Sequence, residues 1–256
     1  MEPVLIVLPA RAASADDIEP YLQTLVSLRA TAPEAMVLVV DDRSQPQFAQ
    51  MLEAAAAELD CAYVLQEDGE GTSAAFNVGL TAGSGHGMDV CLVHSGLVFE
   101  QAGWLDRLRA RTGTDDTPAA IAGGAVIEPT GLIRQAGYFF SLFRRQWSTR
   151  LARVPEALLD EHAALLCPVS SEVQLVRREW IDRTGVYDEL LDGPYAALDY
   201  CLRVAADGGQ VVFEPSVRAR ALVLGEGEPD YELPDARRLR FKHEGVSFQR
   251  WAPEVI

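Results

Sequence analysis

The chain lacks any hydrophobic run long enough to cross a membrane, since no stretch of its 256 residues approaches about 18 consecutive apolar residues. Its first apolar segment, residues 4–8, is too short for a signal peptide and has no basic flank. An excess of positive charge is missing too. The net charge of −16 argues against a protein that coats nucleic acid or binds an anionic membrane surface in general, while leaving room for a local basic site.

Cysteines are few and scattered, at positions 61, 91, 167 and 201, with no C-x-x-C spacing. This pattern favours buried thiols in a reducing compartment, and we therefore expect a cytoplasmic protein. Internal repeats and flexible linkers are also absent. With 48% hydrophobic residues, the chain is long enough for a large core, and we predict one domain over residues 1–256.

The stretch that stands out is an apolar run, residues 35–40, that leads directly into Asp41 and Asp42. An uninterrupted run of this kind is typical of a strand buried on both faces in a parallel sheet. Ligands of open α/β sheets bind outside the carboxyl ends of such strands. A carboxylate there accepts hydrogen bonds from a ribose hydroxyl or a base N–H, so the pair indicates either a nucleotide site or two solvated turn residues.

Around this strand the pattern reads strand–helix–strand–helix–strand. Strands are expected at 4–8, before the central strand, and at 61–65, after it. An amphipathic helix is expected after the strand at 4–8 and another after the central strand. A glycine-containing turn and a helix rich in small residues follow, then a strand at 89–93 that ends at His94-Ser95-Gly96. This order predicts an α/β fold with a parallel sheet and right-handed crossovers.

The composition changes in the second half. Residues 129–155 contain no acid, but hold Arg134, Arg144 and Arg145 among aromatic residues such as Trp147. Aromatic residues in such a stretch are more often core than ligand platform, whereas arginine suits phosphate recognition. Further strands are expected at 119–127, 171–176 and 210–213, with a helix between the last two whose apolar stripe runs over 198–205.

In sum, the motifs resemble those of the GT-A-fold glycosyltransferases of family 2, including its rhamnosyltransferase-like members. The resemblance is carried by the D-D-x-S turn at 41–44, the segments 67–69 and 75–80, G-W-L at 103–105, the G-x-I-x-x-A-G-like turn at 131–137, and the series 176–178, 186–189 and 199–203. It implies a GT-A-like (Rossmann-like) mixed, mostly parallel sheet flanked by helices. Residues 1–115 would form a nucleotide-binding lobe, and residues 116–256 an acceptor-side lobe.

Departures from the family pattern concern the chemistry. Gly96 stands where the family carries a metal-binding aspartate, so the oxygen ligand for Mg²⁺ or Mn²⁺ is missing and a divalent metal is doubtful. Ala197 stands where the general base is expected, and a methyl group takes no proton. The late histidine of the family falls near Ala221.

The resemblance also suggests roles for individual residues. A nucleoside-diphosphate sugar would be the donor, bound by Pro9, Arg11, Asp41, Asp42, Glu67, Gly71, Asn77, His94 and Ser95. Arg134, Arg144, Arg145 and Trp147 would contact an acceptor or a phosphate. Asp188 and Asp192 lie near the missing base and are candidates to replace it. Asp199 is a third candidate, although its spacing to Arg203 also fits an i, i+4 ion pair.

Three functions fit these observations. The first is transfer of a sugar from a nucleoside-diphosphate sugar to an acceptor hydroxyl, the acceptor being a glycan, protein, small molecule or nucleic acid. The second is a catalytically inactive binding or assembly module that keeps the fold. The third is a transferase acting on nucleic acid, with the arginine and aromatic stretch gripping phosphates and bases.

Overall fold

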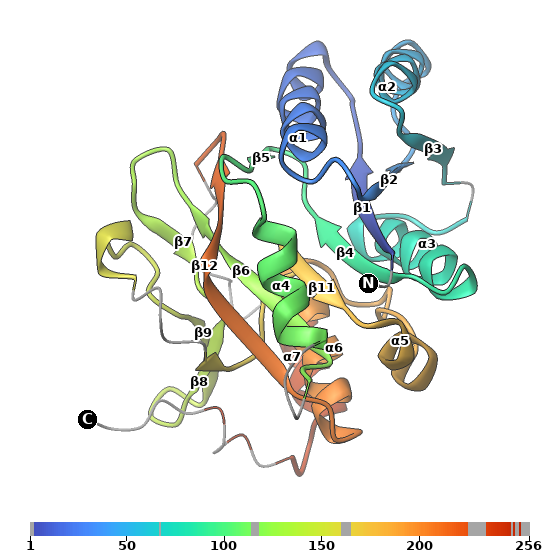
Figure 1. The fold of residues 1–256 in the computed structure, drawn as a ribbon. Helices are drawn as coiled ribbons and strands as arrows, with labels where there is room; N and C mark the ends of the chain where they lie inside the picture. The colour runs from blue at the N-terminus through green and yellow to red at the C-terminus, as the bar shows by residue number, and fades with distance from the viewer. Residues whose placement is uncertain are drawn as a thin grey trace.

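The strand ahead of the acidic pair, β2 (Met36–Asp41), lies between β1 (Val4–Ala10) and β3 (Ala62–Leu65), parallel to both. We describe the protein from a computed structural model, which covers residues 3–66, 68–113, 118–159, 165–224, 234–246, 248 and 251. Strand β4 (Asp89–Val93) pairs in parallel with the other side of β1. The carboxyl ends of these four strands therefore meet at one edge, as the sequence predicts (Figure 1).

The second half of the chain extends the same sheet. Strand β11 (Val173–Val176) is antiparallel to both β4 and β6 (Ile121–Ile127), and β12 (Val211–Ala221) is parallel to β6. The order β10-β12-β6-β11-β4-β1-β2-β3, with β5 (Leu97–Val98) and β7 (Ile133–Gln135) at its margins, makes a ten-stranded sheet. The predicted mixed, mostly parallel sheet in one domain is confirmed.

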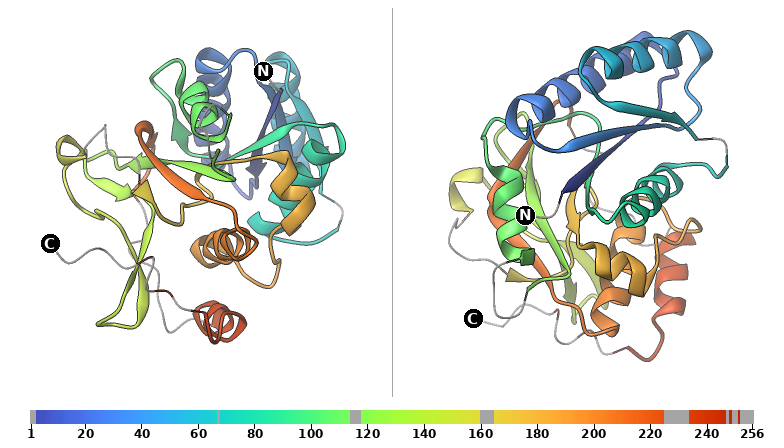
Figure 2. Two further views of the ribbon diagram at one scale, coloured as in Figure 1. Left: turned by 60° about the horizontal axis from the view of Figure 1, so that its bottom comes forward. Right: turned by 45° about the vertical axis from the view of Figure 1, so that its right-hand side comes forward.

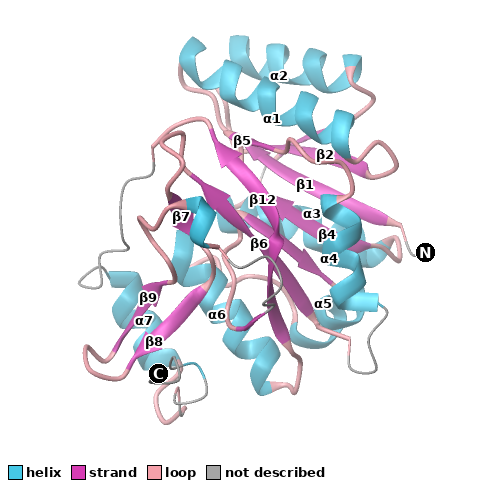
Figure 3. Cartoon of the chain, turned by 60° about the vertical axis from the view of Figure 1, so that its left-hand side comes forward, coloured by secondary structure: helices cyan, strands magenta, loops and turns pink. Residues whose placement is uncertain are grey.

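Helices cover both faces of the sheet (Figures 2 and 3). One face packs against α1 (Ile18–Thr31), α2 (Pro46–Glu58) and α4 (Trp104–Gly113). The other packs against α3 (Thr72–Gly85), α5 (Arg178–Thr184), α6 (Gly193–Ala206) and α7 (Pro234–Lys242). Alternate residues of β1, such as Ile6 and Val7, belong to opposite cores. Two short 3₁₀ helices, η1 (Ala15–Asp17) and η2 (Glu156–Leu158), complete the helical segments described.

The small residues of α3 allow it to lie against the sheet. A Cβ placed on Gly79 would come within 2.2 Å of Val7, so no larger residue fits between α3 and β1. This is the close backbone approach that the composition of the segment indicates. It fixes the start of α3, and with it Gly71, beside the carboxyl end of β2.

Several strands lie outside the predicted pattern. β12 is 11 residues long rather than the four expected, because it bends at a register shift between Phe213 and Arg218 and continues to Ala221. The acid-free stretch forms β7 and a separate hairpin, β8 (Tyr138–Ser141) and β9 (Gln146–Thr149). β10 (Leu165–Leu166) pairs with β12 at the margin. Among the described residues, none of the helices has the length and apolarity needed to traverse a bilayer.

Candidate functional site

The two acidic residues after β2 have different surroundings. Asp41 is fully buried and accepts the Ser44 N–H at 2.8 Å and the Tyr63 hydroxyl at 2.5 Å. Both oxygens are thus used inside the protein, where they hold the turn 41–44 against β3. We infer that Asp41 shapes the site rather than contacting a ligand.

Asp42, by contrast, has an oxygen left over. Its Oδ2 accepts the Gly71 N–H at 3.1 Å and lies 3.5 Å from Nη1 of Arg11. Its Oδ1 is buried and has no partner within the described structure. An unpaired buried acceptor of this kind costs about 1–3 kcal/mol, so its presence at a strand end points to a ligand.

Gln66, at the end of β3, repeats this pattern. Its side chain is 3% exposed, and neither its amide oxygen nor its amide nitrogen has a hydrogen-bond partner in the part of the chain that is described. The Gln66 backbone N–H donates to the Asp41 carbonyl at 2.9 Å, which fixes the end of β3 next to the acidic turn. No motif in the sequence singles out Gln66, because a glutamine after a strand is unremarkable until its burial is known.

The rim around these atoms is charged. Arg11 lies 3.6 Å from Glu70 as well as near Asp42, and Arg43 lies 3.7 Å from Glu70. Pro9 is in β1 at the same edge, paired with Val40. Glu67, which we predicted to bind the nucleotide, lies outside the described residues.

Asn77 lies deeper, in α3, and is already engaged. Its amide nitrogen donates to the Tyr187 carbonyl at 3.0 Å and to Glu189 at 2.8 Å, and its oxygen accepts the Tyr187 N–H at 2.8 Å. The structure thus assigns it to holding the turn after α5.

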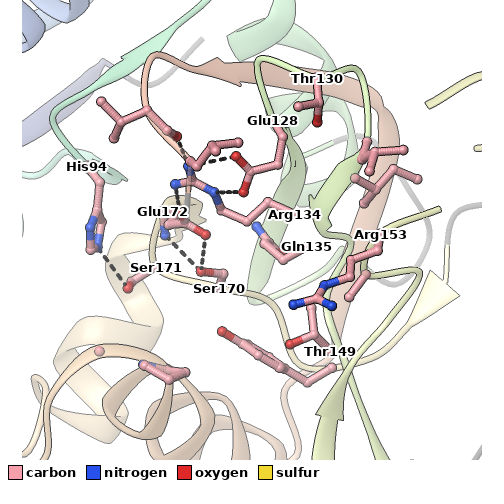
Figure 4. A pocket seen from close by; sticks show the side chains of 18 residues that line it. His94, Glu128, Thr130, Arg134, Gln135, Thr149, Arg153, Ser170, Ser171 and Glu172 are labelled. Carbon is pink, nitrogen blue, oxygen red and sulfur yellow. Dashed lines mark hydrogen bonds and ion pairs between the residues drawn. The ribbon is translucent and has the colours of Figure 1, made fainter. Parts of the chain in front are cut away.

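Across the carboxyl end of β4 lies a cavity of about 720 Å³ (Figure 4). Segments from both halves of the chain line it, including His94, Glu128, Thr130, Arg134, Gln135, Tyr138, Thr149, Arg153, Ser170, Ser171, Glu172, Gly193 and Pro194. The rest of the lining is apolar: Leu132, Ile133, Ala152, Val223 and Leu224. The hydroxyl, amide and carboxylate groups among the polar residues can hydrogen-bond to the hydroxyls of a sugar.

Arg134 lies at the centre of this cavity but is neutralised. Its guanidinium contacts Glu128 at 2.7 Å and Glu172 at 3.2 Å, and it also donates to the Val223 carbonyl. Arg153 extends into the cavity beside Thr149 (Figure 4), and no ion pair or hydrogen bond of its side chain is found among the described residues. Glu128 and Glu172 carried no motif that would have identified them in the sequence, whereas Arg153 belongs to the acid-free stretch whose arginines we expected to face an anionic partner.

His94 stands at the end of β4, on the boundary between the strand edge and the cavity. Its Nε2 is 3.2 Å from the Ser171 hydroxyl and its ring lies 5.3 Å from that of Phe76. Burial lowers the pKa of His94, partly offset by Glu172 and Asp192, so the imidazole is neutral at pH 7. Ser95 is exposed, and the Gly96 N–H donates to Thr24 at 2.9 Å.

These residues do not fit a divalent metal. Mg²⁺ and Mn²⁺ sites need several oxygen ligands, whereas Glu172, a carboxylate of the cavity that contains His94, is already bound to Arg134. No group of three or more His, Cys, Asp or Glu side chains with metal-site geometry occurs in the described ranges.

The three candidate bases separate in the structure. Asp199 is fully buried, with Arg203 at 2.8 Å, His243 at 2.9 Å and Lys242 at 3.0 Å. Burial alone would raise the pKa of Asp199, but the His243 hydrogen bond and the two cations outweigh it and lower it to about 2. The i, i+4 ion pair that the spacing suggested is therefore present, but it lies in the interior and not on a solvated face.

Asp188 is also engaged, since Lys242 donates to it at 2.7 Å and that hydrogen bond lowers its pKa. Asp192 is exposed at the N-cap of α6, where it accepts the Gly193 N–H at 2.8 Å. Its two successors, Gly193 and Pro194, line the cavity. Of the three carboxylates, Asp192 alone borders the cavity and keeps an exposed side chain.

The residues of the acid-free stretch are likewise dispersed. Trp147 is 5% exposed and packs 5.4 Å from the rings of Phe140 and Phe248, so it is a core residue as its residue type favoured. Arg144 and Arg145 lie exposed in the turn of the hairpin. Neither lines the cavity that contains Arg134.

Comparison with protein families gives a match to the model described as glycosyl transferase family 2, over residues 5–147. No curated protein gives a significant match. Similar folds occur in GalNAc-T7 solved with UDP, GalNAc and Mn²⁺ (TM-score 0.67, 17% identity, 94% of this chain and 48% of that one). They also occur in the mannosyltransferase PcManGT from Pyrobaculum calidifontis with GDP-Man and Mn²⁺ (0.55, 18%, 88% and 58%) and in S. aureus TarS 1–349 (0.56, 17%, 86% and 60%). The chain spans about half to three fifths of the length of these proteins.

Proposed function

Because the chain belongs to glycosyl transferase family 2, we propose that it binds a nucleoside-diphosphate sugar and transfers the sugar to an acceptor hydroxyl. The observation that carries this proposal is the set of unpartnered polar atoms on Asp42 and Gln66 at the ends of β2 and β3. Neighbouring folds solved with UDP or GDP-Man support a nucleotide as the ligand.

The unpartnered atoms favour one class of base. The Asp42 carboxylate only accepts hydrogen bonds, so it suits a ring N–H, and the Gln66 amide can donate to an adjacent carbonyl. Uracil, thymine and guanine present a ring N–H beside a carbonyl. Adenine and cytosine present a ring nitrogen lone pair there, which the carboxylate would repel. The expected donors are thus uridine, thymidine or guanosine diphosphate sugars.

Transfer would take place across the mouth of the cavity. The bond between the anomeric carbon and the diphosphate oxygen breaks, the acceptor oxygen bonds to that carbon, and the acceptor proton passes to a base. Asp192, exposed beside the cavity, is the carboxylate best placed to receive it. Arg153 is the cavity cation without a carboxylate partner in the described structure, and is available to the departing diphosphate.

A second candidate is a binding module without catalysis. Ala197, which stands at the position of the expected base, is fully buried and has no group that accepts a proton. Both candidates bind nucleotide, and only the transferase also hydrolyses or transfers the sugar when donor and acceptor are supplied.

The testing experiment is calorimetry with UDP, GDP, ADP and CDP. We expect binding of UDP or GDP at least tenfold tighter than that of ADP or CDP, and loss of this preference in Gln66→Leu. Asp42→Asn should also weaken the binding of UDP or GDP. Asp106 is an exposed acid on α4, so Asp106→Asn serves as the matched control. Equal binding of all four nucleotides would contradict the base assignment, and no binding would contradict the proposed function.

A further inference from the structure

The turn of the β8–β9 hairpin exposes two large apolar side chains at its tip. Phe143 is 96% exposed and Leu142 is 56% exposed. The base of the hairpin is anchored differently, because Phe140 packs against Trp147 at 5.4 Å and against Phe248 at 4.8 Å. The tip therefore contributes no packing to the fold, while the hairpin below it is held in place.

The same turn carries unpaired positive charge. Arg144 and Arg145 are exposed and have no carboxylate partner among the described residues. Arg145 also adopts a positive φ of 54°, a conformation that non-glycine residues adopt only at a cost. Since residues 129–155 contain no acid, no carboxylate of this stretch offsets the two guanidinium groups at the tip, although the whole chain carries −16. Screening over about 8 Å at physiological salt makes the local charge decisive at the tip.

We propose that the hairpin tip, residues 142–145, inserts into the surface of an anionic lipid bilayer. Leu142 and Phe143 enter the boundary between headgroups and acyl chains, and the two guanidinium groups bind lipid phosphates. A protein partner fits less well, because a specific protein interface takes about 20–30 residues on each side and the tip offers four. A bilayer needs only a few inserted side chains and complementary charge.

The inference does not depend on the proposed function. Figure 1 places the hairpin at the lower left of the molecule and α2 at the upper right, so a protein held by the tip would keep the strand edge and α2 away from the membrane. The acidic remainder of the chain opposes any other orientation on an anionic surface. The contact is expected to be reversible, since one short apolar tip anchors weakly.

Sedimentation with sucrose-loaded vesicles tests the proposal. We expect the full chain to bind vesicles of phosphatidylcholine with phosphatidylglycerol, and to bind pure phosphatidylcholine at least tenfold less. Phe143→Ala should weaken partition at least tenfold. Arg144→Ala with Arg145→Ala should weaken it similarly and flatten its dependence on salt.

Matched controls separate the tip from general effects. Met51→Ser removes an apolar residue that is 50% exposed on α2. Arg177→Ala at the N-cap of α5, combined with Arg183→Ala within α5, removes the same charge as the tip variant. Both should bind as the parent chain does. Absence of vesicle binding, or equal losses in the controls, would overturn the proposal. So would a change of oligomeric state in Phe143→Ala without any vesicle binding, since the tip would then be a protein contact.

Discussion

At the carboxyl ends of β2 and β3, Asp42 and Gln66 keep buried polar atoms that find no partner among the residues described. On the other side of β4, the carboxylates Asp199, Glu128 and Glu172 are each bound by cations of the protein itself. We interpret the unpartnered groups as ligand-binding groups, and the ion-paired carboxylates as groups that stabilise the fold. An acid close to the position where the family carries its general base can thus stabilise the fold instead, as Asp199 does.

The largest effect is expected from removing one of the ion-paired carboxylates that stabilise the fold. Asp199→Ala leaves Arg203, Lys242 and His243 without their shared carboxylate, and should lower the free energy of unfolding by about 3–5 kcal/mol. Urea denaturation measures this loss. Asp192→Ala, which removes an exposed carboxylate from the same helix, is the comparison and should cost about 1 kcal/mol through its cap. Equal losses would contradict the contrast.

The same carboxylate predicts a pH dependence. Because the folded pKa of Asp199 is lowered to about 2, its contribution to stability is present above the unfolded value, near 3.9, and is lost as the pH falls towards 2. Unfolding free energies measured between pH 5 and pH 2 should therefore decline more steeply in the parent chain than in Asp199→Asn.

A smaller effect is expected at the cavity. Arg134→Met removes the cation that Glu128 and Glu172 share, and should lower stability by about 2–3 kcal/mol at neutral pH. Nucleotide affinity should change less than threefold, because Arg134 is already paired with Glu128 and Glu172 and Arg153 is the cavity cation proposed to meet the diphosphate. Loss of nucleotide binding at retained folding would show that Arg134 itself binds the nucleotide.

At the carboxyl ends of β2 and β3, a substitution should change nucleotide affinity more than the free energy of unfolding. Asp42→Asn should weaken nucleotide binding by about 1–3 kcal/mol, or roughly 5- to 150-fold, and should change the unfolding free energy by less than about 1 kcal/mol. Calorimetry and urea denaturation of the same preparation give both values. A variant that fails to fold would place Asp42 with Asp199 among the structural acids.

The smallest effect concerns metal. Since the described residues around His94 offer too few oxygen ligands for a divalent cation, nucleotide affinity with Mn²⁺ and with EDTA should differ by less than tenfold, about 1.4 kcal/mol. A larger gain with Mn²⁺ would mean that His94 or Glu172 is a ligand once the nucleotide is bound.

Much of the fold could be predicted because its signal is local. The buried run before Asp41 and the alternating strand and helix patterns place β1 to β4 and the helices between them. The positions of Asp41, Asp42 and Gly71 at one edge follow from parallel strands ending together. What the pattern could not give is the choice between Asp41 and Asp42, which depends on Tyr63 reaching the first and not the second.

The cavity was less predictable because its walls come from distant segments. Glu128, Arg134 and Glu172 meet only when β7 folds back on β6 and β11 enters the sheet between β4 and β6. The acid-free stretch was expected to act as one surface, but the fold divides it. Arg134 enters the cavity, Trp147 enters the core, and Arg144 and Arg145 lie in the hairpin turn.

The most direct test of the central claim is a crystal structure of the chain with UDP or GDP. We predict the base at the carboxyl ends of β2 and β3, with its ring N–H within hydrogen-bond distance of Asp42 Oδ1 and a base carbonyl on the Gln66 amide. A nucleotide bound instead against Arg134 in the cavity, with Asp42 Oδ1 still unpartnered, would contradict the claim.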